Sequence, residues 1–177
     1  MSAAPQVLIV GAGPTGLAAA LFLSRRGVPV RLIDAAETPT ATSKALGVNP
    51  RTLDLLEPTG VTARILAEAG TVDRLHIHRH GQTLAEVHLD RINLDARFPL
   101  AILPQARTEA LLTEALAARG VTVERGLALT ALSQDADAVT AVLSSGETLR
   151  TPLLFAADGA HSTVRKALEL GFPGDAW

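Results

Sequence analysis

A glycine-rich turn between an apolar run and a helix-like segment limits most strongly what this chain can fold into. Residues 6–10 (QVLIV) are almost wholly apolar, as in a parallel strand buried on both faces. Helical spacing follows from Pro14 to Arg26 and stops at Gly27, and residues 28–34 (VPVRLID) are typical of a second strand. Because strand, turn, helix and strand make a right-handed βαβ unit, we predict an α/β, Rossmann-like fold with a parallel sheet.

Later segments predict further elements, including an antiparallel meander. Asn49 is placed to cap a helix that begins at Pro50. Asp-rich and Ser-Ser-Gly turns separate the short apolar runs that would form the meander. The expected elements are a hairpin over 75–89 around Gly81-Gln82, a helix over 106–119, strands over 121–125, 128–132, 138–143 and 148–150, a buried strand over 153–157, and a helix over 162–170 capped by Ser162.

Composition excludes several classes of function. The 177 residues allow one domain, or one domain and part of another. A net charge of −2 and only 3% aromatic residues argue against a nucleic-acid partner, and the lack of cysteine excludes disulfides and thiolate metal sites. No charge precedes Arg25, but the glycine turn interrupts the apolar run well short of a membrane span, so we expect a cytoplasmic protein without a membrane partner.

The turn itself, GAGPTG, matches the dinucleotide-binding pattern G-x-G-x-x-G in the required setting between strand and helix. Gly11 would permit the tight turn, Gly13 would let the backbone approach a diphosphate, and Gly16 would allow close packing of helix and strand. The helix N-terminus adds free N–H groups and positive dipole charge. We therefore expect a diphosphate ligand, the alternative being a glycine turn that binds nothing.

Asp34 closes the second predicted strand and follows Gly11 by about 20 residues, the spacing at which a carboxylate accepts hydrogen bonds from an adenosine ribose. Its negative charge would repel a 2′-phosphate, which favours FAD or NAD over NADP at this site. The alternative is a solvated aspartate at the end of a strand.

Four segments resemble, in order, the class A flavoprotein monooxygenases, the family of para-hydroxybenzoate hydroxylase and the polyketide and phenol hydroxylases. They are VLIVGAGPTGLAAALFLSRRG, SKALGVNPRTLDLLEPTGV, LPQARTEALLTEAL and FAADGAHSTVRKAL, whereas residues 59–97 match least. The resemblance implies that residues 1–177 are the N-terminal portion of an FAD-binding domain, incomplete at the C-terminus, with a hairpin within 71–100 on the substrate-domain side. The last segment resembles the family's second fingerprint, implicated in binding FAD and NAD(P)H, through Asp158, Gly159, Ser162 and Arg165.

The resemblance also implies cofactor-binding roles for particular residues. The FAD pyrophosphate would be held by Gly11, Gly13, Pro14, Thr15 and Gly16. The remaining contacts would be Asp34 on the adenosine ribose, Lys44 on the pyrophosphate where the family has arginine, Gln105 on the ribityl chain, the backbone of Leu129 on adenine, and Asp158 and Gly159 on the pyrophosphate and flavin side. For Lys44 and Gln105 the alternative is an ordinary solvated loop position.

In this family NAD(P)H reduces the flavin, and a flavin hydroperoxide then hydroxylates an aromatic ring. The resemblance therefore implies FAD as cofactor, NAD(P)H as electron donor and an aromatic, phenolic or polyketide substrate, with no catalytic side chain in this chain. The family's third fingerprint, a Gly-Asp followed by proline, is not assigned to Gly174-Asp175, which directly follows the second. We expect the isolated chain to bind FAD weakly and to hydroxylate nothing, which oxygen consumption with NADPH and FAD would test.

Two alternatives belong to other classes. An NAD-dependent dehydrogenase would share the glycine turn and Asp34, but would continue with regular βα alternation instead of a Thr/Pro-rich connection and a meander. A non-catalytic interaction module would show no affinity for flavin.

Histidines alternate along the predicted hairpin at His76, His78 and His80, with His88 further on. His-x-His pairs occur in metal sites, but Arg79 interrupts the series and no carboxylate obviously completes it. We expect a solvated hairpin face and no metal.

Overall fold

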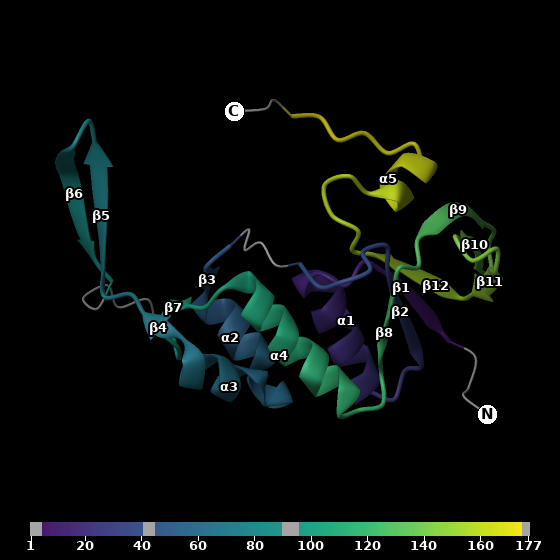
Figure 1. The fold of residues 1–177 in the computed structure, drawn as a ribbon, viewed down its shortest axis with the longest axis horizontal. Helices are drawn as coiled ribbons and strands as arrows, with labels where there is room; N and C mark the ends of the chain where they lie inside the picture. Colours follow the sequence, from purple (N-terminus) through teal and green to yellow (C-terminus); the bar gives the residue numbers. More distant parts are fainter. Residues whose placement is uncertain (1–4, 41–44, 90–95, 175–177) are drawn as a thin grey trace. The chain divides into compact units, whose positions relative to one another are not determined.

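The computed structural model describes residues 5–40, 45–89 and 96–174. They divide into two compact units, one made of Met1–Ala41 with Leu112–Trp177 and the other of Thr42–Leu111 (Figure 1). Helix α4 (Gln105–Ala117) runs from the second unit into the first.

The first unit contains a parallel sheet with strand order β12-β1-β2-β8. Helix α1 (Pro14–Arg25) connects β1 to β2, which confirms the predicted βαβ unit and the Rossmann-like fold. All four residues of β1 are buried, because the strand has a neighbour on each side and Leu17 and Leu21 of α1 are buried in the same unit. The strands are β1 (Val7–Val10), β2 (Val30–Asp34), β8 (Val123–Arg125) and β12 (Leu153–Ala156).

The predicted antiparallel meander is also present, in the order β11-β10-β9. It consists of β9 (Leu129–Gln134), β10 (Val139–Leu143) and β11 (Thr148–Thr151). Its apolar side chains share one buried cluster with those of the parallel sheet, namely Leu8, Val10, Ile33, Leu129, Ala141, Leu143 and Val164. The meander therefore covers one face of the parallel sheet next to the ends of β1 and β2.

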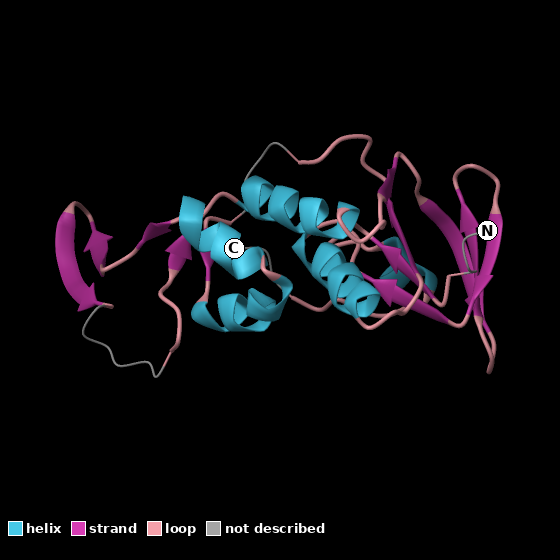
Figure 2. Ribbon diagram, turned by 90° about the horizontal axis from the view of Figure 1, so that it is seen from below, coloured by secondary structure: helices cyan, strands magenta, loops and turns pink. Residues whose placement is uncertain are grey.

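The second unit is built mainly from helices and short strands (Figure 2). Asn49 caps α2 (Pro50–Leu56) as predicted, with its Oδ1 accepting from Thr52 N at 2.8 Å. The 3₁₀ helix η1 (Glu57–Thr59) and helix α3 (Val61–Glu68) were not predicted. Three further short strands, also not predicted, form a sheet in the order β3-β7-β4: β3 (Gly47–Val48), β7 (Ala101–Ile102) and β4 (Gly70–Thr71).

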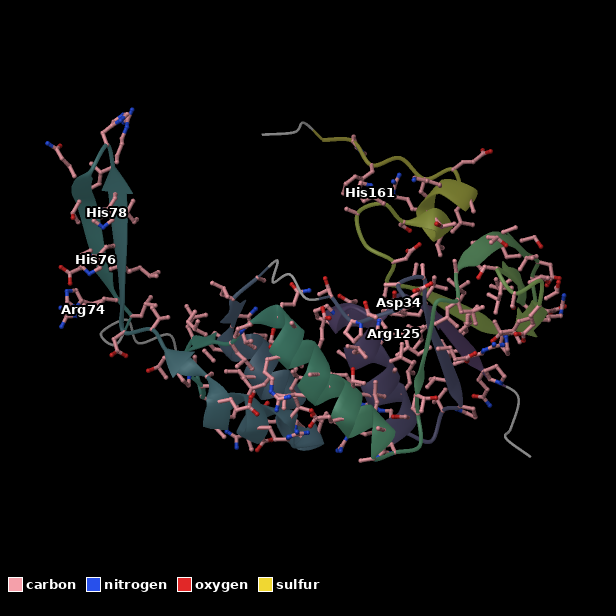
Figure 3. The ribbon with its side chains drawn as sticks, in the orientation of Figure 1. Asp34, Arg74, His76, His78, Arg125 and His161 are labelled. Atoms are coloured by element: carbon pink, nitrogen blue, oxygen red, sulfur yellow. The ribbon has the colours of Figure 1, made fainter. Side chains whose placement is uncertain are left out.

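The predicted hairpin consists of β5 (Arg74–Arg79) and β6 (Gln82–His88). His76 and His78 lie on exposed positions of β5 (Figure 3), and their rings are stacked. His80 lies in the turn, with a positive φ of 48°. The three imidazoles therefore do not share one face. Among the described residues, no group of three or more histidines and carboxylates is arranged to hold a metal ion.

Two predictions near the C-terminal end are wrong. The strand expected to be buried is β12, an edge strand that pairs only with β1 among the described residues. Leu153 and Phe155 lie on one face of this strand, and because other described residues leave that face largely uncovered they are 62% and 40% exposed. The expected nine-residue helix is only α5 (Thr163–Ala167), since Glu169 adopts a positive φ of 55° that ends the helical path. Ser162 does cap α5, with its Oγ accepting from Arg165 N at 3.0 Å.

Over residues 5–40, 45–89 and 96–174, no helix combines the length and the apolar character needed to cross a membrane.

Arg31 on β2 joins the parallel sheet to the meander through an ion-pair network. Its guanidinium donates to both carboxylate oxygens of Glu124 on β8, at 2.7 and 2.8 Å, and to both of Glu147, at 2.5 and 2.8 Å. The hydrogen bonds from Arg31 lower the pKa of Glu147 below its ordinary value of 4.5, and those to Glu147 and Glu124 raise the pKa of Arg31. We name Arg31, Glu124 and Glu147 the Arg31 clamp.

The Arg31 clamp predicts an acid-dependent loss of stability. A carboxylate whose pKa is lower in the folded chain stabilises the fold above its unfolded pKa, and that contribution disappears as the pH falls through the folded pKa. The ionised Glu147 carboxylate therefore contributes fully to stability above about pH 4.5, and its contribution decreases as the pH falls below that value. As the pH is lowered from about 5 to about 3, we expect the urea concentration at the midpoint of unfolding to decrease. The decrease should be less steep in Arg31→Gln. An equally steep fall in Arg31→Gln would contradict this origin.

Candidate functional site

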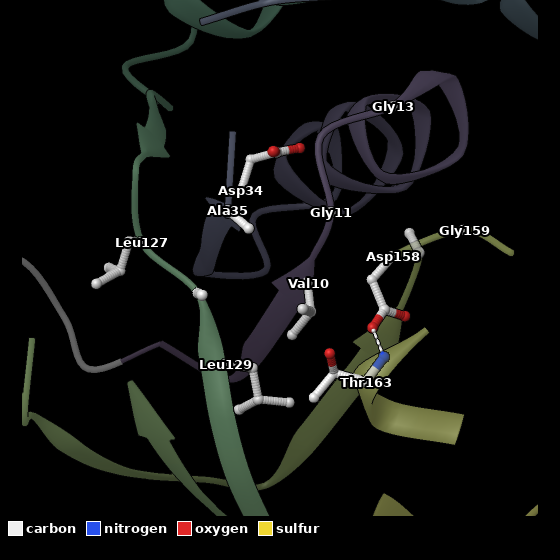
Figure 4. A pocket seen from close by; sticks show the side chains of 12 residues that line it. Val10, Gly11, Gly13, Asp34, Ala35, Leu127, Leu129, Asp158, Gly159 and Thr163 are labelled. Carbon is white, nitrogen blue, oxygen red and sulfur yellow. Dashed lines mark hydrogen bonds between the residues drawn. The ribbon is translucent and has the colours of Figure 1, made fainter. Parts of the chain in front are cut away.

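A pocket of about 260 Å³ opens at the carboxyl ends of the strands in the first unit. Open α/β sheets bind ligands in this position. The glycine turn and the end of β2 form one side, the segment before β9 a second, and the segment after β12 a third (Figure 4). The lining residues are Val10, Gly11, Gly13, Asp34, Ala35, Leu127, Ala128, Leu129, Ala157, Asp158, Gly159 and Thr163.

The three glycines of the turn are required for different reasons. Gly11 has a φ of 101°, and a Cβ there would overlap the carbonyl of Ala157. A Cβ on Gly16 would overlap the carbonyl oxygen of Gly11, which confirms the close packing of helix and strand. A Cβ on Gly13 would meet no atom within 4 Å, and its φ of −75° suits any residue. The fold therefore explains Gly11 and Gly16, whereas Gly13 leaves open space at the pocket.

The N-terminus of α1 faces the same turn without a side-chain cap. Gly13 is the N-cap residue and has no side chain to donate or accept, and the first turn of α1 carries no acidic residue. The first N–H groups of a helix have no partner within the helix and carry partial positive charge. The arrangement therefore suits an anion such as a diphosphate.

Asp34 lines the pocket at the end of β2, and its carboxylate binds the glycine turn. Its Oδ2 accepts from Ala12 N at 2.6 Å, and its Oδ1 accepts from Ala36 N at 2.8 Å. A carboxylate has about four acceptor positions, so both oxygens can still accept hydrogen bonds from a ligand. Arg125 is the parallel-sheet partner of Asp34 on β8, and Figure 3 labels the two next to each other.

Asp158 and Gly159 line the side of the pocket formed by the segment after β12. The Asp158 carboxylate turns toward the start of α5, where Oδ1 accepts from Ser162 Oγ at 2.6 Å and Oδ2 from Thr163 N at 2.7 Å (Figure 4). Asp158 therefore fixes α5 against the pocket, while the backbone of Asp158 and Gly159 continues past it.

The structure brings only part of the predicted set together. Gly11, Gly13, Asp34, Leu129, Asp158 and Gly159 all line one pocket, whereas Pro14, Thr15 and Gly16 form the first turn of α1 behind it. Gln105 lies in the second unit at the start of α4, where its Nε2 donates to Glu109 Oε1 at 2.8 Å. Lys44 lies outside the described residues.

Two apolar residues of the lining, Leu127 and Ala128, were not predicted from the sequence. Neither residue is in a strand, and neither carries a polar group that marks a site. One signal was available: Gly126, with a φ of 69°, directly precedes them and marks the bend that brings the chain back past Asp34.

Comparison with known proteins gives the family. A family model described as "FAD binding domain" matches residues 4–176. The 6-methylpretetramide 4-monooxygenase of Streptomyces rimosus is 41% identical over 176 residues, covering 97% of this chain and 32% of that protein. The chain therefore belongs to the FAD binding domain family, which favours a flavoprotein over an NAD-dependent dehydrogenase.

Solved structures of related flavoproteins share the fold. The flavin-dependent monooxygenase PieE, solved with FAD and substrate, superposes with a TM-score of 0.86 at 31% identity, covering 97% of this chain and 33% of that one. The p-nitrophenol 4-monooxygenase PnpA of Pseudomonas putida gives a TM-score of 0.91 at 27% identity, covering 100% of this chain and 46% of that one. The chain spans about a third of the length of the curated relatives it matches.

Proposed function

We propose that the pocket binds the ADP half of FAD, and that the chain is the FAD-binding portion of an NAD(P)H-dependent monooxygenase acting on aromatic, phenolic or polyketide substrates. The observation that carries the proposal is the open face of Gly13, in front of an uncapped helix N-terminus and beside the Asp34 carboxylate. The names of relatives such as 6-methylpretetramide 4-monooxygenase support the substrate class.

Each part of the pocket suits one part of the ligand. The diphosphate would lie over Gly13, where backbone N–H groups and the α1 dipole offset its charge. Asp34 would accept hydrogen bonds from the adenosine ribose with its remaining lone pairs. The apolar side chains of Leu127 and Ala128, with the backbone of Leu129, would contact adenine.

The rest of the cofactor would reach residues beyond the pocket lining. We assign Asp158 and Gly159 to the side of the pyrophosphate that leads to the flavin. Gln105 would contact the ribityl chain, and Lys44 would contact the pyrophosphate. When bound, FAD would supply redox and oxygen chemistry that no side chain can provide. The hairpin β5–β6 would belong to the substrate side, whereas the pocket residues would bind and orient the cofactor.

The test is binding of FAD and ADP to the purified chain, with Asp34→Asn as the variant. Because asparagine keeps an acceptor for Ala12 N but loses the charge, we expect ADP to bind about tenfold more weakly, the effect of losing a charge-assisted hydrogen bond. The same change should narrow the preference for ADP over 2′,5′-ADP, since the repulsion of the 2′-phosphate is removed. Isothermal titration calorimetry measures both effects.

Asp137→Asn is the matched control, because it removes the same charge from an exposed turn of the meander outside the pocket lining. We expect Asp137→Asn to bind both nucleotides as the parent chain does. A parent chain that binds neither FAD nor ADP would overturn the proposed function and favour a non-catalytic interaction module.

A further inference from the structure

The apolar side of the pocket is a segment without regular secondary structure. Leu127 and Ala128 lie between β8 and β9 and belong to neither strand. Leu129 opens β9, and its side chain is held in the buried cluster that the meander shares with the parallel sheet. We name Leu127–Leu129 the pocket wall. The position of its first two residues depends on hydrogen bonds from elsewhere in the fold.

Ser144 supplies two of these hydrogen bonds from the turn between β10 and β11. Its N–H donates to the carbonyl oxygen of Ala128 at 2.8 Å, and its Oγ accepts from Ala128 N at 3.0 Å. Leu127 N donates to the carbonyl oxygen of Asp34 at 3.0 Å. The peptide groups of the pocket wall are therefore fixed between the end of β2 and the turn that carries Ser144.

The Arg31 clamp holds that turn from its other end. Glu147 closes the turn: Leu143 N donates to the carbonyl oxygen of Glu147 at 2.9 Å, and Gly146 N donates to the carbonyl oxygen of Leu143 at 2.9 Å. Arg31 binds both oxygens of Glu147 while it also binds Glu124 on β8, the strand that leads into the pocket wall. A bidentate guanidinium fixes direction as well as distance. The turn therefore has a defined position relative to the parallel sheet.

We propose that Ser144 is a positioning residue for adenine recognition, acting through Ala128 in a turn that the Arg31 clamp fixes. The inference rests on the proposed function, because it takes the pocket wall as the adenine contact. Losing the Ser144 hydroxyl leaves Ala128 N without its acceptor, so this peptide group can rotate and the apolar surface offered to the base is no longer preorganised.

The test compares ADP with ribose 5-diphosphate, which keeps the groups expected at Asp34 and Gly13 but lacks the base. In Ser144→Ala we expect ADP to bind about fivefold more weakly, the effect of one lost hydrogen bond, with ribose 5-diphosphate unchanged. Ser144→Thr keeps a hydroxyl oxygen at the same position. In this variant the ratio of the dissociation constants of ADP and ribose 5-diphosphate should equal that of the parent chain. Arg31→Gln, which releases the turn but retains Ser144, should shift the ratio in the same direction.

Two matched controls separate positioning from general stability. Ser133→Ala removes an exposed hydroxyl from β9, and Arg150→Gln removes the ion pair with Asp135 on the same meander. Both should leave the ratio of the two dissociation constants unchanged. A loss of affinity that is equal for both ligands in Ser144→Ala would indicate a merely structural role and would overturn the inference.

Two other outcomes are distinguishable. If the parent chain binds ADP no more tightly than ribose 5-diphosphate, the pocket wall does not recognise adenine and the inference fails, although the diphosphate site stands. If the parent chain binds neither, the proposed function fails and the inference falls with it.

Discussion

Gly13→Val is expected to abolish FAD binding at micromolar concentrations while leaving the chain folded. The new side chain meets no protein atom within 4 Å of its Cβ, and φ at Gly13 is −75°, so the fold tolerates it. The same side chain fills the space over which the diphosphate would approach the N-terminus of α1. Losing two charge-assisted hydrogen bonds, at about 1.5 kcal/mol or more each, weakens binding by roughly 100-fold.

Quenching of flavin fluorescence measures the affinity, and circular dichroism on heating measures the fold. Gly70→Val is the matched control, because a Cβ on Gly70 also meets nothing within 4 Å, but Gly70 lies in β4 of the second unit. It should bind FAD as the parent chain does. FAD affinity in Gly13→Val equal to that of the parent would show that the ligand does not lie over this glycine.

Gly16→Ala is expected to cost about 3 kcal/mol or more of folding free energy, although alanine is the better helix former by about 1 kcal/mol. Its Cβ would overlap the carbonyl oxygen of Gly11 and lie 3.3 Å from the Cβ of Ala157. Relief would require α1 to move away from β1, and the backbone of Gly11 is itself packed against Ala157. The clash therefore cannot be absorbed by one flexible side chain.

The urea midpoint and the soluble fraction on expression measure this loss. Gly13→Ala is the matched control, since it adds the same methyl group three residues earlier, where there is room. We expect Gly13→Ala to unfold within about 1 kcal/mol of the parent. A Gly16→Ala chain as stable as Gly13→Ala would contradict the packing described here.

The elements that the sequence predicted well are those with a strong local signal. The apolar run at 6–10, the glycine turn and the stop at Gly27 act over neighbouring residues, so the βαβ unit and the position of Asp34 follow from local chemistry. The Asn49 cap was predictable for the same reason. Helix α3 was missed although a local signal was available, since its buried residues Val61, Thr62 and Ile65 have the spacing of one helical face.

What could not be predicted depends on contacts between distant parts of the chain. Arg31 meets Glu124 and Glu147, which are 93 and 116 residues away in the sequence. The segment LLFAA has the composition of a buried strand, but its exposure is decided by whether distant parts of the chain cover the faces of the sheet at this edge. Leu127 and Ala128 line the pocket through the path of the backbone and not through any chemical signature.

The open edge of β12 has a practical consequence for work with the isolated chain. No other described strand pairs with this edge, so its backbone groups and the exposed side chains of Leu153 and Phe155 offer a template on which other strands can add, a common route to aggregation. Titrations should therefore run at low protein concentration, with light scattering recorded alongside, so that precipitation is not mistaken for ligand-induced signal.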